Sequence, residues 1–233
     1  MRIGCVPYGH AKPFSGAWSG TEVVWDHPKN LVGRLKSGEV EVALVPVWEV
    51  LTNPGYRVID GVAVGSRGEV RSVAVFHDKP LADCDSITLT RHSMTSVQLW
   101  RLVAERKLKV TLKEVKAGEA RLLIGDEALV EWKRKKGKGL TDLGKEWWDW
   151  TGKPFVFAVW AVGPKAQLGT GEFHQFRQAC LAGIERRGDL AEGEEERDYL
   201  TNCIQYGLGK EEKEGLMEFA NRSGLREAKV EWV

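Results

Sequence analysis

The sequence predicts an α/β fold of two lobes with a ligand cleft between them. Short apolar runs alternate with segments of helical periodicity, a pattern typical of α/β proteins. Long apolar strands are expected over 70–76 and 155–162, and they bracket the middle third of the chain. If the C-terminal helices pack back on the first unit, these strands are the crossovers of a protein that closes on a small ligand. A plain two-domain α/β chain is the alternative.

The first unit is expected to consist mainly of strands. The one helix is predicted over 30–36, because Asn30 can cap its N-terminus and Gly38 can end it. Pro7 and Gly9 end the first strand and place His10 on a turn at the C-terminal end of that strand. The predicted strands of this unit, each a short apolar run, lie at 2–7, 22–25, 40–47, 58–64 and 70–76.

A second unit starts near Pro80, and a helical tail follows Pro164. The predicted lobes are therefore residues 1–76 together with 164–233, and residues 77–163. Strands are expected in the second unit at 86–89, 110–115, 121–124 and 155–162, and helices at 92–107 and 141–150. The tail is expected to form helices at 172–186, 195–206 and 211–221, and to pack on the first lobe.

Composition and charge exclude several classes of protein. The 233 residues are 42% hydrophobic and 29% charged, and the net charge of +1 gives no reason to expect nucleic acid or a membrane surface as partner. No apolar run approaches the ~20 residues that span a bilayer. The N-terminus lacks the apolar core of a signal peptide. We therefore expect a cytoplasmic protein.

The cysteines and histidines are too scattered to indicate a metal or redox site. Cys5, Cys84, Cys180 and Cys203 stand singly, which indicates reduced and mostly buried thiols. The five histidines form no pair with metal-ligand spacing, so no metal is expected. The chain also lacks a Walker loop, a GxGxxG motif and a nucleophile elbow. These absences leave the usual hydrolase, kinase and dehydrogenase classes without support.

The best candidate for anion binding is the stretch from Arg91 to Ser96. The hydroxyl groups of Ser93, Thr95 and Ser96 lie between a predicted strand and a predicted helix. Free N–H groups at a helix start attract anions, and hydroxyls add donors. Capping of the helix is the structural alternative, but one hydroxyl suffices for it. The cluster therefore favours carboxylate binding.

Other polar candidates lie at predicted strand ends. Arg71 and Ser72 fall where a crossover strand meets the cleft. The structural alternatives are a surface salt bridge for Arg71 and, for Ser72, a small residue at a tight crossing. Gly125 and Asp126 follow a strand directly, which permits acid–base work or helix capping. Stacking on a ligand ring is possible for the aromatic residues, but packing in a lobe core explains most of them. They are Trp147, Trp148, Trp150, Phe155, Phe157 and Trp160.

Several stretches, taken together and in order, resemble the chorismate dehydratases of the futalosine route to menaquinone. The resemblance is close over residues 1 to about 165 and loose over the tail. It implies a two-lobed periplasmic-binding-protein-like fold of type II in a cytoplasmic enzyme. The stretches are RIGCVPY (2–8), VALVP (42–46), GEVRSV (68–73), SMTS (93–96), LIGDEAL (123–129), DLGKEW (142–147) and TGKPFVFAVW (151–160).

The resemblance implies a site and one departure from the family pattern. The family usually reads Tyr-Leu-Asn-Ala near its N-terminus, whereas this chain has His10 in place of the asparagine that lines the substrate site. His10 and Ser72 are therefore the expected catalytic residues. The expected substrate-binding residues are Pro46, Val47, Arg71, Ser93, Met94, Thr95, Ser96, Gly125, Asp126 and Phe155.

The implied reaction converts chorismate to 3-[(1-carboxyvinyl)oxy]benzoate and water without metal or cofactor. Removal of the proton on the ether-bearing carbon spreads negative charge onto the ring carboxylate, so donors are needed there. Ser93, Thr95 and Ser96 suit that carboxylate, and Ser72 suits the other. The substrate's own enolpyruvyl carboxylate is the expected base. His10 is an additional candidate, because an ordinary imidazole exchanges protons near neutral pH.

Two alternatives remain open at this stage. One is the sister enzyme of the same route, 1,4-dihydroxy-6-naphthoate synthase. The other is a cytoplasmic protein that binds small carboxylates without chemistry, which the exchange of asparagine for His10 favours. The sequence also leaves open whether the chain forms a homodimer.

Overall fold

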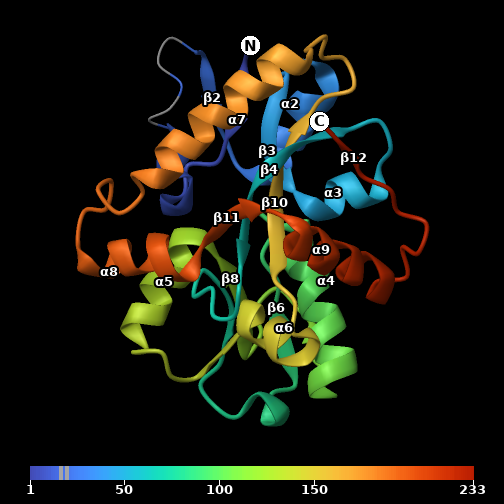
Figure 1. Cartoon of the computed structure of the whole chain (residues 1–233). Helices are drawn as coiled ribbons and strands as arrows, with labels where there is room; N and C mark the ends of the chain where they lie inside the picture. The colour runs from blue at the N-terminus through green and yellow to red at the C-terminus, as the bar shows by residue number, and fades with distance from the viewer. Residues whose placement is uncertain (16–17, 19–20) are drawn as a thin grey trace.

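The structure is a computed structural model that describes residues 1–15, 18 and 21–233. Its strands form two separate sheets, one in the upper and one in the lower half of Figure 1. The larger sheet has seven strands in the order β11-β4-β10-β3-β1-β2, with β12 beside β4. Its strands are β1 (Ile3–Cys5), β2 (Val23–Trp25), β3 (Val42–Pro46), β4 (Arg57–Ser66), β10 (Phe155–Val162), β11 (Gln205–Leu208) and β12 (Glu231–Trp232).

The smaller sheet has five strands in the order β7-β6-β8-β5-β9. Strand β8 pairs in parallel with β6 and antiparallel with β5. The sheet therefore mixes both orientations, as the larger one does, where β10 is antiparallel to both of its neighbours and β1 is parallel to both of its own. Its strands are β5 (Val73–Phe76), β6 (Ser86–Thr88), β7 (Lys113–Glu114), β8 (Ala120–Ile124) and β9 (Leu140–Asp142).

Helices cover both sheets, which confirms the predicted α/β class. Those of the N-terminal segment are η1 (Gly9–Ala11), α1 (Lys12–Ser15), α2 (Pro28–Ser37) and α3 (Val47–Thr52). Those of the middle segment are η2 (Leu81–Asp83), α4 (Met94–Val103), the π-helical turn η3 (Ala104–Leu108), α5 (Gly125–Arg134) and α6 (Leu143–Thr151). Those of the tail are α7 (Thr170–Glu185), α8 (Glu194–Asp198), the π-helical turn η4 (Tyr199–Cys203) and α9 (Lys210–Arg222).

The tail packs mainly on the larger sheet. Helix α7 contacts α1 and β4, α9 contacts β10, and β11 pairs with β4. In Figure 1 the segment from α8 to α9 crosses the middle of the molecule, and its strand β11 forms an edge of the larger sheet. The C-terminal segment therefore lies close to the junction at which a ligand cleft is expected.

The predicted lobe boundaries are wrong by several residues. Strand β5 belongs to the smaller sheet and β10 to the larger one, so neither strand crosses between them. The chain passes from one sheet to the other within 67–72 and again within 152–154. The boundaries at 76/77 and 163/164 were misplaced because both strands are buried apolar runs, and such a run does not reveal which sheet it joins.

Several local predictions also need correction. Helix α2 begins at Pro28 after His27, so Asn30 lies inside it and does not cap it, whereas Gly38 ends it with a φ of 83° as predicted. Val47 was assigned to a strand but begins α3. The helix expected over 195–206 ends at Cys203, and β11 follows it.

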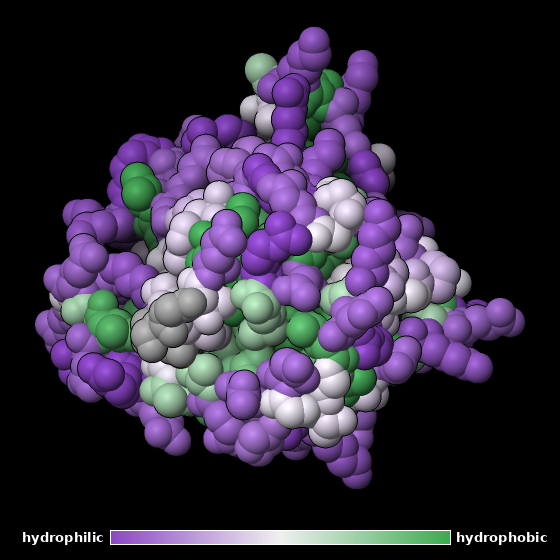
Figure 2. Space-filling view, turned by 90° about the horizontal axis from the view of Figure 1, so that it is seen from above, coloured by the Kyte–Doolittle hydropathy of each residue, from purple (hydrophilic) through white to green (hydrophobic). Residues whose placement is uncertain are grey.

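The buried core is largely aliphatic and aromatic. Phe155, Trp147 and Phe219 pack edge to face with ring centroids 5.0–6.1 Å apart, so core packing accounts for most of the aromatic cluster. The four cysteines are all buried and unpaired. On the face shown in Figure 2 hydrophilic residues predominate, with smaller apolar areas between them.

The described residues contain neither a helix that could span a membrane nor a group of metal-ligating side chains. None of their helices is both long and apolar enough to cross a membrane. Across 1–15, 18 and 21–233, no three histidine, cysteine, aspartate or glutamate side chains are grouped as metal ligands.

Candidate active site

A cavity of about 60 Å³ lies between the two sheets. Both halves of the molecule and the tail contribute to it, so it is built by parts of the chain far apart in sequence. Most of its lining is apolar, and its polar side chains come from Tyr8, His10, Ser72, Ser93 and Ser96. A mainly apolar pocket with a few convergent polar groups is the usual form of a small-molecule site.

His10 reaches the cavity from the turn η1, directly after β1. The tail holds this turn, because the Tyr206 hydroxyl donates a hydrogen bond of 2.9 Å to the His10 carbonyl. The ring of Tyr8 lies beside the imidazole with centroids 5.6 Å apart. Burial lowers the pKa of His10 from 6.5 to about 4. The imidazole is therefore neutral at neutral pH and is only a weak base.

Ser72 is 4% exposed and lies on a tight turn between the two sheets. Its N–H donates to the Val70 carbonyl at 2.6 Å, and Arg71 between them has a φ of 60°, a conformation that costs free energy in a residue with a side chain. The Ser72 carbonyl accepts from the Gly125 N–H at 2.8 Å. These contacts hold the backbone of Ser72 on both sides.

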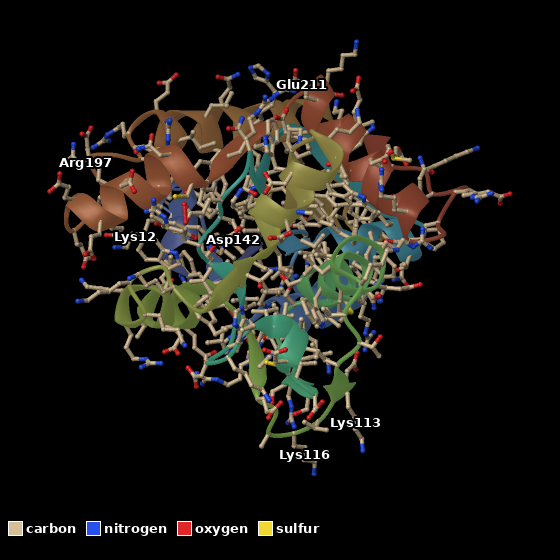
Figure 3. The ribbon with its side chains drawn as sticks, turned by 90° about the horizontal axis from the view of Figure 1, so that it is seen from below. Lys12, Lys113, Lys116, Asp142, Arg197 and Glu211 are labelled. Carbon is tan, nitrogen blue, oxygen red and sulfur yellow. The ribbon has the colours of Figure 1, made fainter. Side chains whose placement is uncertain are left out.

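Asp142 stabilises this strained turn through hydrogen bonds to its N–H groups. Its carboxylate is 5% exposed and accepts hydrogen bonds from the N–H groups of Val70 (3.1 Å), Arg71 (2.6 Å) and Lys145 (2.9 Å). Figure 3 shows Asp142 among the ribbons in the middle of the view. Burial raises its pKa to about 6, although the three N–H groups oppose that rise. One buried carboxylate thus joins the crossover turn to the start of α6.

Ser93 and Ser96 line the cavity at the N-terminus of α4. The Ser93 hydroxyl accepts a hydrogen bond of 3.2 Å from the Ser96 N–H and lies 3.0 Å from the Ser96 hydroxyl. Ser93 is therefore the helix cap. Since one hydrogen bond joins the two hydroxyls, one of their two protons remains for a ligand, close to the positive end of the helix.

A wider groove of about 970 Å³ lies next to the cavity and shares Tyr8 with it. Arg71 lines this groove, where it contacts Asp198 of the tail at 2.5 Å and lies over the ring of Trp132 at 4.7 Å. Asp126 lies there too and accepts a hydrogen bond of 3.0 Å from the Gly9 N–H, so it does not cap its own helix. These contacts join parts built on different sheets, so the structure is in a closed form.

Comparison with known proteins decides the family. A family model described as menaquinone biosynthesis matches residues 1–224. The chain belongs to this menaquinone biosynthesis family. It is 28% identical to a chorismate dehydratase from Thermus thermophilus over 239 residues, which cover 88% of each chain. The predicted resemblance to chorismate dehydratases is confirmed.

Solved structures show the fold of this family member. A protein from Archaeoglobus fulgidus superposes with a TM-score of 0.69 at 18% identity and covers 96% of this chain and 97% of its own. A Candida albicans protein with the generic periplasmic-binding-protein fold superposes with a TM-score of 0.64 at 11% identity, covering 98% and 91%. The menaquinone biosynthesis protein described here has that fold, as predicted.

The structure brings half of the predicted site residues of this family member to the cavity. Arg71 and Asp126 lie in the neighbouring groove instead. The residues that line the cavity are His10, Pro46, Ser72, Ser93, Ser96 and Gly125.

The remaining four predicted residues line neither the cavity nor the groove. Thr95 is fully buried, and its hydroxyl accepts a hydrogen bond of 3.1 Å from the Trp48 N–H, so it joins α4 to α3 and is not open to a ligand. Phe155 packs in the aromatic core. Val47 is buried in α3, and Met94 lies in the first turn of α4 outside the cavity lining.

Phe157 lines the cavity, although it was named only as one of several aromatic residues that could stack on a ligand and not as an expected substrate-binding residue. A register shift between Val156 and Ala158 leaves Phe157 as the extra residue opposite β4. Such a bulge redirects a side chain, and here the consecutive residues Phe157 and Ala158 both reach the cavity. Ile204 also lines it, but the tail shows no sequence motif that marks this position.

Proposed function

We propose that this chain is a chorismate dehydratase, a carbon–oxygen lyase that converts chorismate to 3-[(1-carboxyvinyl)oxy]benzoate and water. The observation that carries the proposal is the cavity with Ser72, Ser93, Ser96 and His10, in a chain 28% identical to a chorismate dehydratase. The cavity offers hydroxyl donors for two carboxylates and one imidazole among apolar walls. This combination suits a cyclic dicarboxylate.

The reaction needs stabilisation of charge on the ring carboxylate. Chorismate loses a proton from the ether-bearing carbon and hydroxide from the next carbon, and the ring becomes aromatic. We assign Ser93, Ser96 and the N-terminus of α4 to the ring carboxylate, because donors held in place there stabilise developing charge. Ser72 is assigned to the enolpyruvyl carboxylate. Thr95 has no part in this assignment, since its hydroxyl is bonded to Trp48.

The enolpyruvyl carboxylate of the substrate is the proposed base. An imidazole is ordinarily a stronger base than a carboxylate, and only a lowered pKa removes that advantage. Burial lowers the pKa of His10 to about 4, which makes the imidazole a weak proton acceptor at neutral pH. His10 instead forms a hydrogen bond to the substrate, as the family's asparagine does by the resemblance.

Substrate entry requires the two halves of the molecule to separate. The cavity of about 60 Å³ is much smaller than the roughly 300–1,000 Å³ of typical ligand pockets. The contacts of Arg71 with Asp198 and of Asp126 with Gly9 must break for the cleft to open. Both contacts are partly or fully exposed to solvent, so each costs little to break.

Incubation of the purified protein with chorismate tests the proposal. The expected product is an aromatic compound lighter than chorismate by one molecule of water, identified by mass spectrometry and ultraviolet absorbance. A boiled sample provides the control for spontaneous decay of chorismate. Conversion of chorismate at the rate of the boiled sample contradicts the proposal.

A protein that binds a small carboxylate without chemistry is the second candidate. Its support is His10, which replaces the family's asparagine and has a pKa too low for efficient proton transfer. Binding of chorismate in calorimetry without turnover favours this candidate over the lyase.

A further inference from the structure

Two histidine side chains stack on each other where the two halves of the molecule meet. The imidazole rings of His27 and His92 have centroids 4.5 Å apart and an interplanar angle of 29°. His27 directly precedes α2, which packs on β1 and β3 of the larger sheet. His92 lies between β6 of the smaller sheet and α4. Figure 1 shows α2 in the upper half of the molecule and α4 in the lower half, so the stacked rings join the two halves.

The histidine pair lies on the solvent side of the candidate active site. Both histidines are exposed, whereas the next residue after each of them, Pro28 and Ser93, lines the cavity. A third cavity residue contacts the pair directly, because the Tyr8 hydroxyl lies 3.2 Å from Nδ1 of His27. The stacked rings therefore cover the outer side of the cavity wall. They must part when the two halves separate.

Tyr8 is a second contact across the same junction. It follows β1 of the larger sheet, and its ring packs on Gly125 at the start of α5, which packs on the smaller sheet. A Cβ atom on that glycine would lie 3.1 Å from the ring. The contact between Tyr8 and His27 survives protonation of the imidazole, because Nδ1 then donates to the phenol oxygen. A response to pH therefore comes from the stack of the two imidazoles.

Stacked imidazoles resist a second proton. An ordinary imidazole changes its charge between pH 5 and pH 8, and two rings in contact titrate as a pair because their positive charges repel. The carboxylate beside His27 is that of Asp26, which accepts a hydrogen bond of 2.8 Å from the His27 N–H. It is already paired with Arg34 at 3.0 Å. Asp26 therefore offers little compensation for a second positive charge.

The other charged and titratable groups near the pair do not supply that compensation either. Lys29 and Arg91, which flank the pair in sequence, add positive charge. Burial raises the pKa of Tyr8 above its ordinary value and lowers the pKa of His10 to about 4, so both side chains are neutral between pH 5 and pH 8. Repulsion between the two stacked rings is thus left uncompensated.

We propose that the stack of His27 on His92 is a closing contact of the cleft and that protonation of both imidazoles opens it. The open form accepts the second proton without repulsion, so it binds more protons than the closed form and is favoured as the pH falls below about 6.5. Two unit charges at this separation shift an equilibrium about fivefold in water, and by more near a protein surface. The device controls access to the cavity whatever reaction follows.

A pair of spin labels across the groove measures the opening. Trp25→Cys on β2 and Val130→Cys on α5 place one label on each half, because both residues are exposed and line the groove. The four native cysteines are buried and therefore react poorly with the label. Double electron–electron resonance gives the distance between the labels without substrate. We expect a short distance at pH 8 and, at pH 5.5, a longer one as well, with a ratio of open to closed molecules about fivefold higher or more.

His92→Phe in the labelled protein separates the stack from other effects of pH. It keeps an aromatic ring against His27 but removes one charge, and a protonated imidazole is attracted to the face of that ring. We therefore expect the short distance at both pH values. His174→Phe is the matched control, since it makes the same exchange at an exposed site on α7 and should leave the opening unchanged.

Two results would overturn the proposal. One is a label distance that is the same at pH 8 and pH 5.5 in the protein with both histidines. The other is an opening at pH 5.5 that His92→Phe retains in full. All the labelled proteins keep His10, so any effect of its burial on folding is common to them. The measurement needs no chorismate, and its outcome is therefore independent of the lyase proposal.

Discussion

Replacement of His10 by asparagine should change how the stability of the protein depends on pH. The folded protein holds His10 with a pKa of about 4, whereas the ordinary value is 6.5. The unfolded chain therefore binds a proton at His10 that the folded chain rejects. The resulting stability is complete above pH 6.5 and is lost as the pH falls from 6.5 towards 4.

The magnitude follows from the two pKa values. Between pH 8 and pH 5, the His10 imidazole removes at most about 2 kcal/mol from the free energy of unfolding. Asp142 acts in the opposite direction, because its folded pKa of about 6 lies above its ordinary value of 3.8, so acidification stabilises the folded form. Both proteins contain Asp142. The difference between them therefore isolates His10.

Urea unfolding of the wild type and His10→Asn at pH 8 and pH 5 measures this difference. We expect the wild type to lose about 2 kcal/mol more than His10→Asn on acidification. His174→Asn is the matched control, since His174 is exposed on α7 and should leave the pH dependence of the wild type unchanged. An equal loss of stability in the wild type and His10→Asn would refute the conclusion that the fold keeps His10 neutral.

Two further predictions concern the hydroxyl cluster and the buried carboxylate. Ser96→Ala should weaken chorismate binding about tenfold or more in calorimetry. Thr95→Ala should instead lower the free energy of unfolding by about 1–3 kcal/mol, because it leaves the Trp48 N–H unpaired. Equal effects of the two substitutions on the affinity for chorismate would contradict the assignment. Asp142→Ala should lower the free energy of unfolding by about 3 kcal/mol or more in urea, because it leaves three N–H groups unpaired, and Asp142→Asn, which keeps one acceptor oxygen, should lower it less. A fully stable Asp142→Ala protein would refute the role of this carboxylate in the crossover turn.

The larger elements were predictable because their local patterns are strong. The strand Phe155–Val162 has the bounds expected from its apolar run, and Gly38 ends its helix in the left-handed conformation that glycine favours. Periodicity and turn residues depend on neighbours in sequence. They therefore identify elements well, but they do not show which sheet a buried strand such as β5 joins.

The site was only partly predictable, because packing decides which side chains reach the cavity. The hydroxyls of Thr95 and Ser96 look equivalent in sequence, yet the rotation between consecutive helical residues directs Thr95 to Trp48 and Ser96 to the cavity. A bulge brings Phe157 to the cavity, and the apolar run that contains it does not reveal the bulge. The Tyr206 hydroxyl reaches the His10 carbonyl from 196 residues away in sequence, so only the fold reveals this contact.

The most direct test of the lyase proposal is steady-state turnover of chorismate by the wild type beside Ser72→Ala. The wild type should release 3-[(1-carboxyvinyl)oxy]benzoate continuously, and Ser72→Ala should do so with a kcat/KM roughly ten- to a hundredfold lower, since it lacks a hydrogen bond to a charged group. A wild type that forms no product, or a Ser72→Ala variant as active as the wild type, would contradict the assignment of this reaction to the cavity between the two sheets.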